Sequence, residues 1–486
     1  MRLTYLAYTF SLVMKYFSIV LFFPIIVALW YKEYTSIPPF LIAILTAISL
    51  AYVIKRFVNG AKNIKSVNDI KKSEGLTVVT FSWIFAGLFA SIPYMFMDIT
   101  PINALFEGFS GITATGATAF TTFDYPHSLL FWRSFTQWLG GMGIIVLFIA
   151  VLPQLAIAGR QLFFAEAPGP TEEKFTPRIK STAAALWKIY AGLTLLCFIL
   201  ITNMGMGLFE GLCTSFSAMS GGGFSPNPNS LIGQSHNILW VITFFMFFAG
   251  VSFNLQHKAW IKFNPFVLFK NEEFRTYFIA VVVIALLLAF SLFANMHYTF
   301  FDSLVHAFFN VTSLVSSTGF CSVDFAKWDY TSKILLFAIM LFGSCAASAG
   351  GGLKVARWLL IFKIMKLEMM KILHPKAVYN IKIGTHTVPK EILYQTLMFV
   401  SFYFAFLVLS AFLVAILEKD TVTAVVGSVA AVGNIGPGLG QIGPMGHFAN
   451  LTTATKIIFI IDMLAGRLEL IPFLVLFQKD LWSFRK

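Results

Sequence analysis

Thr113-Ala114-Thr115-Gly116-Ala117 is the first of four short stretches of small residues that decide the fold of this chain. The other three are Ser220-Gly221-Gly222-Gly223-Phe224, Ser317-Thr318-Gly319-Phe320 and Asn434-Ile435-Gly436-Pro437-Gly438. Each follows an apolar segment of about 10 to 14 residues that is helical in character but too short to cross a bilayer. Residues 103–112 and 422–432 are examples. Each segment is therefore predicted to enter the membrane and turn back.

Four such turns predict a shared, water-filled centre, because non-helical backbone inside a membrane persists only where protein or water satisfies its polar groups. A spanning helix is predicted on either side of each turn. This gives four repeats over residues 77–152, 183–256, 274–362 and 391–477, after an N-terminal pair of transmembrane helices at 1–58. The predicted fold class is an all-α membrane protein in which four pseudosymmetric helix–pore loop–helix repeats surround one central pore.

The composition of the 486-residue chain points to a membrane protein, since 58% of its residues are hydrophobic and only 12% are charged. Soluble domains carry roughly one quarter charged residues. We expect ten apolar crossings of the bilayer. The first, over residues 5–30, is expected to remain as a membrane helix, because it is too long for a signal peptide and is interrupted by Lys15 and Pro24.

Lys and Arg give the chain a net charge of +13, and they lie in alternate connections between the predicted spans. The connections at 56–75, 159–182, 258–275 and 354–390 hold many of them. Positive loops stay in the cytoplasm, so both termini are predicted to be cytoplasmic. Because the positive residues do not form one patch, we expect a lipid bilayer around the protein and no nucleic acid partner.

The small turns have the chemistry of a cation filter. A potassium ion that enters a membrane must exchange water for other oxygens, and rings of backbone carbonyls supply them. Glycine at Gly116, Gly222, Gly319 and Gly436 would let the backbone approach the ion closely. The residues predicted to bind potassium are Thr113, Ala114, Thr115, Gly116, Ser220, Gly221, Gly222, Ser317, Thr318, Gly319, Asn434, Ile435 and Gly436. The short helices before the turns would direct their negative C-terminal ends toward the same centre.

A second group of residues is predicted to form a gate. The run from Gly343 to Gly352 is too rich in small residues to continue as a straight helix. It is either a flexible element below the filter or a surface for close helix packing. Arg467 lies within the last predicted span and is either a gate or part of a structural ion pair with Asp462 or Glu469. The predicted gate residues are Gly343, Ser344, Ser348, Gly350, Gly351, Gly352 and Arg467.

Glu107 and Glu210 occur in matching phrases on the short helices before the first two turns. Their offsets from the filter glycines differ. We therefore expect each carboxylate to satisfy nearby backbone donors rather than to bind the ion directly.

The chain resembles the TrkH branch of the Trk/Ktr/HKT potassium transporter superfamily over nearly its whole length. The resemblance is carried by the four turns and by residues 133–141, 168–170, 176–179, 351–355, 434–440 and 466–469. It implies potassium as the transported ion, no covalently bound cofactor, an intramembrane gating loop at 343–352 and a pore-proximal arginine at Arg467. It further implies a bacterial inner-membrane location, a homodimer and a cytoplasmic nucleotide-binding regulatory subunit of the Trk type.

Three positions differ from the pattern of that family. They are Asn103, where an acidic residue is expected, the triple glycine at 221–223, and Asp462 within the last span.

The sequence therefore favours potassium uptake through a gated, channel-like path, with proton coupling left open. A sodium-permeable transporter of the same superfamily is the alternative, although Gly116 rather than serine at the first filter glycine argues against it. A membrane-embedded enzyme is a remote third reading. The chain has no HExxH or GxSxG motif and no His/Asp cluster of the kind such chemistry needs.

Overall fold

The computed structural model describes residues 3–57, 72–150, 175–376, 379–384, 386–476 and 478. The ends of the N-terminal pair and of the first and fourth predicted repeats, at 58, 151–152 and 477, lie outside the described residues. So do most of the basic connections at 56–75 and 159–182 and the motif at 168–170.

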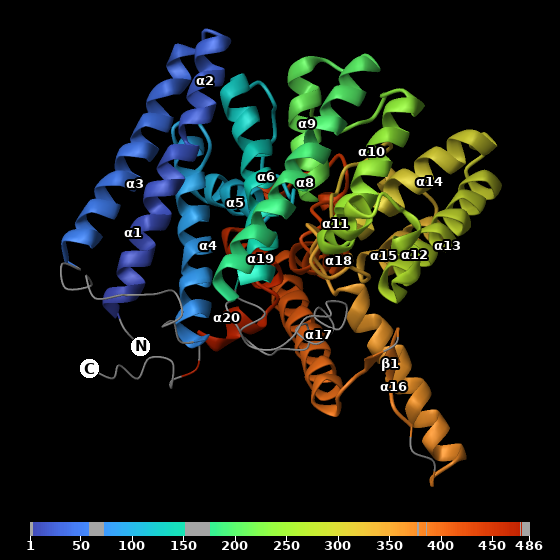
Figure 1. Ribbon diagram of the computed structural model, residues 1–486. Helices are drawn as coiled ribbons and strands as arrows, with labels where there is room; N and C mark the ends of the chain where they lie inside the picture. Colours follow the sequence, from blue (N-terminus) through green and yellow to red (C-terminus); the bar gives the residue numbers. More distant parts are fainter. Residues whose placement is uncertain are drawn as a thin grey trace.

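The first element is an N-terminal helical hairpin. It consists of α1 (Leu3–Val20), α2 (Phe22–Trp30), the short 3-10 helix η1 (Tyr34–Ser36) and α3 (Ile37–Phe57). The predicted first crossing at 5–30 is present as two consecutive helices, with Leu21 between them. Figure 1 shows these helices along one flank of the protein.

The rest of the chain repeats one element order four times: a long helix, a short helix that ends in a turn, and a second helix. The first two sets are α4 (Lys72–Met95), α5 (Pro101–Ile112) and α6 (His127–Ala150), then α8 (Phe175–Asn203), α9 (Leu208–Ser220) and α10 (His236–Ala249). The last two are α13 (Glu272–Asn295), α14 (Phe300–Val315) and α15 (Tyr330–Met340), then α17 (Lys390–Glu418), α18 (Thr421–Val432) and α19 (Thr453–Arg467).

The remaining elements connect or extend these sets. They are α11 (Phe253–Ile261), α12 (Phe266–Lys270), α16 (Val355–Leu373), α20 (Ile471–Val475), η5 (Phe325–Lys327), η6 (Gly440–Ile442) and η7 (Phe448–Asn450). Strands β1 (Lys382–Ile383) and β2 (His386–Thr387) form one small antiparallel pair. Helix α16 projects away from the body of the protein (Figure 1).

The expectation of ten long apolar crossings is wrong in one respect. Among the described residues, six helices are long and apolar enough to cross a membrane alone, or seven if α10 and α11, bent by 102°, count as one span. The second helices of the last three repeats are the short ones: α10 has 14 residues, α15 has 11 and α19 has 15, whereas α6 in the first repeat has 24.

Local sequence explains where the short helices begin. Thr299 accepts a hydrogen bond from the Asp302 N–H at the start of α14, and Asp420 accepts from the N–H groups of Val422 and Thr423 at the start of α18. These are N-cap contacts. Helix α5 begins instead with Pro101, a residue favoured in the first turn because its missing N–H has no helical partner there.

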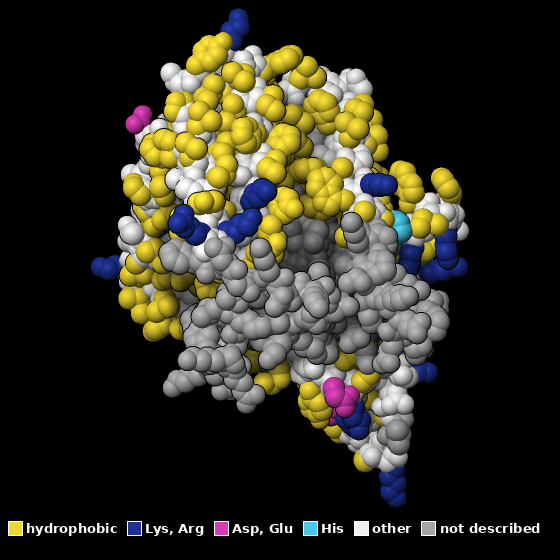
Figure 2. Space-filling model, turned by 60° about the vertical axis from the view of Figure 1, so that its left-hand side comes forward, with side chains coloured by type: hydrophobic (Ala, Val, Ile, Leu, Met, Phe, Trp, Pro, Cys, Tyr) yellow, Lys and Arg dark blue, Asp and Glu magenta, His cyan; other side chains and the backbone are white. Residues whose placement is uncertain are grey.

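Burial divides the protein into a closed interior and an apolar exterior. The short helices are largely inside, and α14 alone buries ten residues. The long helix α17 has exposed side chains such as Met398, Phe402 and Phe412. Figure 2 shows hydrophobic side chains over most of the upper part of one face, with Lys and Arg side chains toward its lower border. This distribution fits a protein surrounded by lipid.

Candidate functional site: a ring of four turns above a loop

The four turns share one backbone conformation. In each, a residue one or two positions after the end of the short helix and a glycine two positions further on have positive φ. The pairs are Ala114 (50°) and Gly116 (83°), Gly221 (66°) and Gly223 (74°), Ser317 (56°) and Gly319 (83°), and Asn434 (51°) and Gly436 (98°). The shared pattern shows that these residues are structurally equivalent in the four repeats.

This pattern corrects one prediction. The equivalent of Gly116 in the second repeat is Gly223, whereas Gly222 was predicted. Gly222 is not among the residues with positive φ, and it corresponds to Thr115, Thr318 and Ile435 in the other turns. In a run of three glycines the side chains give no indication of which residue takes the left-handed conformation.

The turns contact one another in a closed ring. A methyl group on Gly116 would lie 2.0 Å from the carbonyl oxygen of Gly222, and one on Gly223 would lie 1.9 Å from that of Thr318. The ring continues from Gly319 to the Ile435 oxygen at 2.1 Å and from Gly436 to the Thr115 oxygen at 2.6 Å. The four turns therefore meet at one place, and the repeats follow one another around it in sequence order.

The surroundings of the ring favour a cation electrostatically. Helices α5, α9, α14 and α18 all end at the residue just before or at the start of their turn. The C-terminal end of a helix carries the equivalent of about half a negative charge. Four such ends lie around the same centre.

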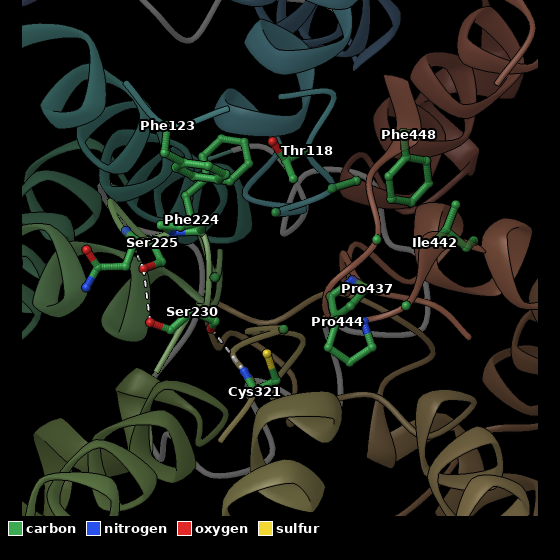
Figure 3. A pocket seen from close by; sticks show the side chains of 18 of the residues that line it. Thr118, Phe123, Phe224, Ser225, Ser230, Cys321, Pro437, Ile442, Pro444 and Phe448 are labelled. Carbon is green, nitrogen blue, oxygen red and sulfur yellow. Dashed lines mark hydrogen bonds between the residues drawn. The ribbon is translucent and has the colours of Figure 1, made fainter. Parts of the chain in front are cut away.

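One side of the ring opens into a cavity lined by all four repeats. Thr118 and Phe123 come from the first, Phe224, Ser225 and Ser230 from the second, Cys321 from the third, and Pro437, Ile442, Pro444 and Phe448 from the fourth. Figure 3 shows these side chains arranged around an open centre. Gly116, Gly223, Gly319 and Pro437 belong to the same lining, so the cavity reaches the ring itself.

A buried ion pair supports the first turn. Glu107 Oε1 lies 2.7 Å from Arg133 Nε, and the second carboxylate oxygen accepts a hydrogen bond from the Ala119 N–H at 2.9 Å. The Arg133 guanidinium also donates to the Ser225 carbonyl at 3.0 Å and lies over the Phe224 ring. Glu107 therefore satisfies local donors, as predicted, and ties the first turn to the second.

Glu210 and Asn103 have similar supporting contacts. Glu210 accepts hydrogen bonds from the amides of Asn227 and Gln234 at 2.6 and 3.1 Å, which hold the segment after the second turn. Asn103, where an acidic residue was expected, accepts from Lys456 Nζ at 2.8 Å. Lys456 also donates to the Ala449 carbonyl at 2.7 Å.

The glycine-rich run at 343–352 is not helical. Helix α15 ends at Met340, α16 begins at Val355, and the chain between them packs against the ring. The Gly351 N–H donates to Ser317 Oγ at 2.6 Å. A methyl group on Gly350 would lie 2.6 Å from the Ser316 carbonyl oxygen, and one on Gly351 would lie 2.5 Å from that of Gly433. The loop thus lies directly against the third and fourth turns.

Five further hydrogen bonds give the loop its shape. Ser344 Oγ and Ser348 Oγ are 2.7 Å apart, and the Ser348 hydroxyl donates to the Cys345 carbonyl at 2.6 Å. The buried Lys354 ammonium donates to the Gly350 carbonyl and to Ser344 Oγ. The Gly343 N–H donates to the Leu353 carbonyl at 2.9 Å, which closes the base of the loop.

Arg467 contacts this loop directly. Its guanidinium donates to the carbonyl of Ala349 at 2.9 Å and to that of Gly140, in α6, at 3.0 Å. The proposed ion pairs with Asp462 and Glu469 are wrong. Glu469 Oε2 pairs with Arg357 at 2.6 Å, and Asp462 accepts a hydrogen bond from Ser410 at 2.5 Å.

A second, smaller cavity brings together four of the seven predicted gate residues, Gly350, Gly351, Gly352 and Arg467. It is lined by Gly350, Gly351, Gly352, Lys354, Gly466, Arg467 and Glu469. The sequence predicts Arg467 and the glycines, whereas Lys354 lies in the 351–355 motif without a predicted role. Gln137, whose amide contacts Gly222, was also missed. The sequence holds one signal for Gln137: the second turn has Gly222 where the other turns have a side chain, so another residue must fill that space.

The fold and this site define a polytopic all-α membrane protein with a fourfold ring of backbone turns at its centre and a non-helical loop against one side of that ring. Residues 44–484 match the model of the TrkH family, described as cation transport proteins, and the chain belongs to this family. It is therefore a transport protein rather than an enzyme.

Individual relatives agree with this assignment. The chain is 37% identical to the Trk system potassium uptake protein TrkH of Salmonella typhimurium, over 86% of this chain and 88% of that protein. It is 34% identical to the TrkH of Vibrio parahaemolyticus, over 97% and 98% of the two chains. The crystal structure of the potassium transporter TrkH from Vibrio parahaemolyticus superposes with a TM-score of 0.90 and 31% identity, covering 99% of this chain and 100% of that one.

Proposed function

We propose that this protein takes up potassium across the bacterial inner membrane through a path that runs along the axis of the ring. The observation that carries the proposal is the closed set of contacts from Gly116 to Gly222, Gly223 to Thr318, Gly319 to Ile435 and Gly436 to Thr115. Carbonyl oxygens at a common centre can replace the water of a dehydrated monovalent cation. Family membership and the potassium uptake proteins among its relatives support the choice of ion.

The filter in this proposal consists of the predicted turn residues, with Gly223 added as the equivalent of Gly116. The cavity of Figure 3 is the vestibule through which the ion reaches the ring. The four helical units over 77–152, 183–256, 274–362 and 391–477 each contribute one quarter of the filter.

The gate in this proposal is the loop at 343–352 held by Arg467. The loop lies against the third and fourth turns through Gly350 and Gly351, so an ion leaving the ring would meet it next. Two hydrogen bonds from Arg467 connect it to α6 and α19. Displacement of the loop would open the path.

The remaining parts of the proposal follow from the family and from charge. The basic connections lie in the cytoplasm together with both termini, and the protein works as a homodimer with a cytoplasmic nucleotide-binding regulatory subunit of the Trk type. The beginning of α1 and helix α20 lie toward the same end of the protein in Figure 1, which supports termini on one side.

The test is radioactive rubidium uptake by purified protein in liposomes, with an imposed membrane potential and the regulatory subunit present. We expect uptake that external potassium inhibits more strongly than sodium. Equal inhibition by the two ions would favour the sodium-permeable alternative. If neither rubidium nor potassium enters, the proposed function is wrong.

The matched controls are empty liposomes and the variant Gly319→Ala. A methyl group at that position would lie 2.1 Å from the Ile435 carbonyl oxygen. It would also require φ of 83° from a residue with a side chain. We expect this variant to fold but to lose uptake.

A further inference from the structure

The second turn differs from the other three at one position of the ring. Thr115, Thr318 and Ile435 each place a side chain between the two residues with positive φ, and the second turn has Gly222 there. The space is not empty. A methyl group on Gly222 would lie 2.5 Å from Cδ and 2.6 Å from Oε1 of Gln137. Gln137, from α6 of the preceding repeat, fills the place of the missing side chain.

Gln137 also makes two hydrogen bonds to this turn. Its Nε2 donates to the Gly222 carbonyl at 2.6 Å, and its Oε1 accepts from the Phe224 N–H at 3.0 Å. The Phe224 N–H can only donate, so the two contacts fix the orientation of the amide. The side chain is fully buried. Both of its polar ends are therefore committed to the backbone of the second turn.

This contact makes one ring carbonyl unlike the others. In the described part of the chain, the carbonyl of Gly222 accepts a side-chain hydrogen bond, whereas no hydrogen bond is formed to the carbonyls of Thr115, Thr318 and Ile435. The Gly222 oxygen nevertheless keeps its place, because its 2.0 Å approach to the Gly116 methyl position matches the 1.9 and 2.1 Å found for the next two turns.

A run of three glycines has more conformational freedom than any other tripeptide, so it needs an external support to hold one shape. From these contacts we propose that Gln137 is the positioning residue of the second filter turn. It acts as the side chain that Gly222 lacks, holds the Gly222 carbonyl in the ring, and thereby sets the discrimination between potassium and the smaller sodium ion. The proposal rests on the proposed filter function.

The same contact explains the triple glycine. Gly221 and Gly223 adopt positive φ, and Gly222 leaves the room that the Gln137 amide occupies. A larger residue at 222 is excluded as long as Gln137 is present. The two positions are therefore expected to depend on each other.

The experiment compares variants of Gln137 in the rubidium uptake assay with the full-length protein. Gln137→Ala removes both volume and hydrogen bonds, and Gln137→Met keeps the volume without the hydrogen bonds. Because one hydrogen bond changes an equilibrium by roughly threefold to tenfold, we expect both variants to lose discrimination against sodium by about that factor. Uptake of rubidium itself should persist.

A compensating pair separates a positioning role from a general loss of stability. Gly222→Thr alone should abolish uptake, because its side chain would collide with Gln137. The double variant Q137A/G222T should recover discrimination above the level of Gln137→Ala, since the second turn then has the side chain that the first and third turns have. Failure of this recovery would show that Gln137 does not replace the side chain of residue 222.

The matched control is Gln256→Ala. Gln256 is also buried and donates to two backbone carbonyls, those of Phe248 and Val251, outside the ring. Its variant should change thermal stability without changing discrimination.

Unchanged discrimination in Gln137→Ala, or in Gln137→Met should the alanine variant fail to fold, would overturn the inference. Absence of rubidium uptake by the unmodified protein would overturn the proposed function instead, so the two failures are distinguishable.

Discussion

Replacing Arg467 by alanine tests the gate most directly. The guanidinium donates to the Ala349 carbonyl at 2.9 Å and to the Gly140 carbonyl at 3.0 Å, so it connects the loop at 343–352 to two helices. A hydrogen bond to a charged donor contributes about 1.5 to 3 kcal/mol. Without the guanidinium, the loop conformation that obstructs the path is held by roughly one fewer such hydrogen bond, the one to Ala349. The population of the displaced loop then rises about tenfold to hundredfold.

The assay is the initial rate of rubidium uptake in liposomes at equal amounts of folded protein. We expect Arg467→Ala to raise this rate and to reduce its dependence on the regulatory subunit. Arg467→Lys is the matched control, because it keeps the charge but presents a single ammonium group in place of the two-pronged guanidinium. It should give an intermediate rate. An unchanged or lower rate for Arg467→Ala in well-folded protein would refute the proposed role of the loop.

Three other substitutions probe the ring and its supports. Gly223→Ala should reduce uptake more than tenfold, because the methyl group would lie 1.9 Å from the Thr318 carbonyl oxygen. The control Gly192→Ala, with no atom within 4 Å of the added methyl group, should leave uptake unchanged. Equal uptake by the two variants would contradict the assignment of Gly223 as the equivalent of Gly116. Glu107→Ala leaves the Arg133 guanidinium buried without its counter-ion and should lower the free energy of unfolding by about 3 to 5 kcal/mol. The measurement is the loss of thermal stability. The control Glu368→Ala, in the exposed pair with Lys371, should lower it by less than about 1 kcal/mol. Asn103→Asp places a carboxylate where the amide oxygen is 2.8 Å from Lys456 Nζ, and the added charge opposite the ammonium should raise thermal stability slightly. An unchanged or lower melting temperature would contradict this electrostatic explanation.

The repeated architecture is predictable from the sequence because the signals for it are local. Short apolar segments such as 422–432 followed by a glycine turn cannot be spanning helices, and the structure contains a short helix at each of these places. The break at 343–352 was also predictable, since ten consecutive small residues provide too few side-chain contacts to hold a helix.

Other features were not predictable for equally physical reasons. The partners of Arg467 are backbone carbonyls from distant segments, and every residue has a carbonyl, so the sequence offered only the carboxylates of Asp462 and Glu469 as visible candidates. The register of the second turn was lost because Gly221, Gly222 and Gly223 are identical in sequence. Their different φ values arise from contacts with other repeats.

The order of the repeats around the ring has a consequence for experiments on this protein. In a pore assembled from identical subunits, one codon change alters every quadrant at once. Here all four quadrants are encoded separately, so Thr115, Gly222, Thr318 and Ile435 can be edited one at a time. The contribution of each quadrant to ion preference can thus be measured separately by substitutions in a single gene, without tandem fusions or mixed assemblies.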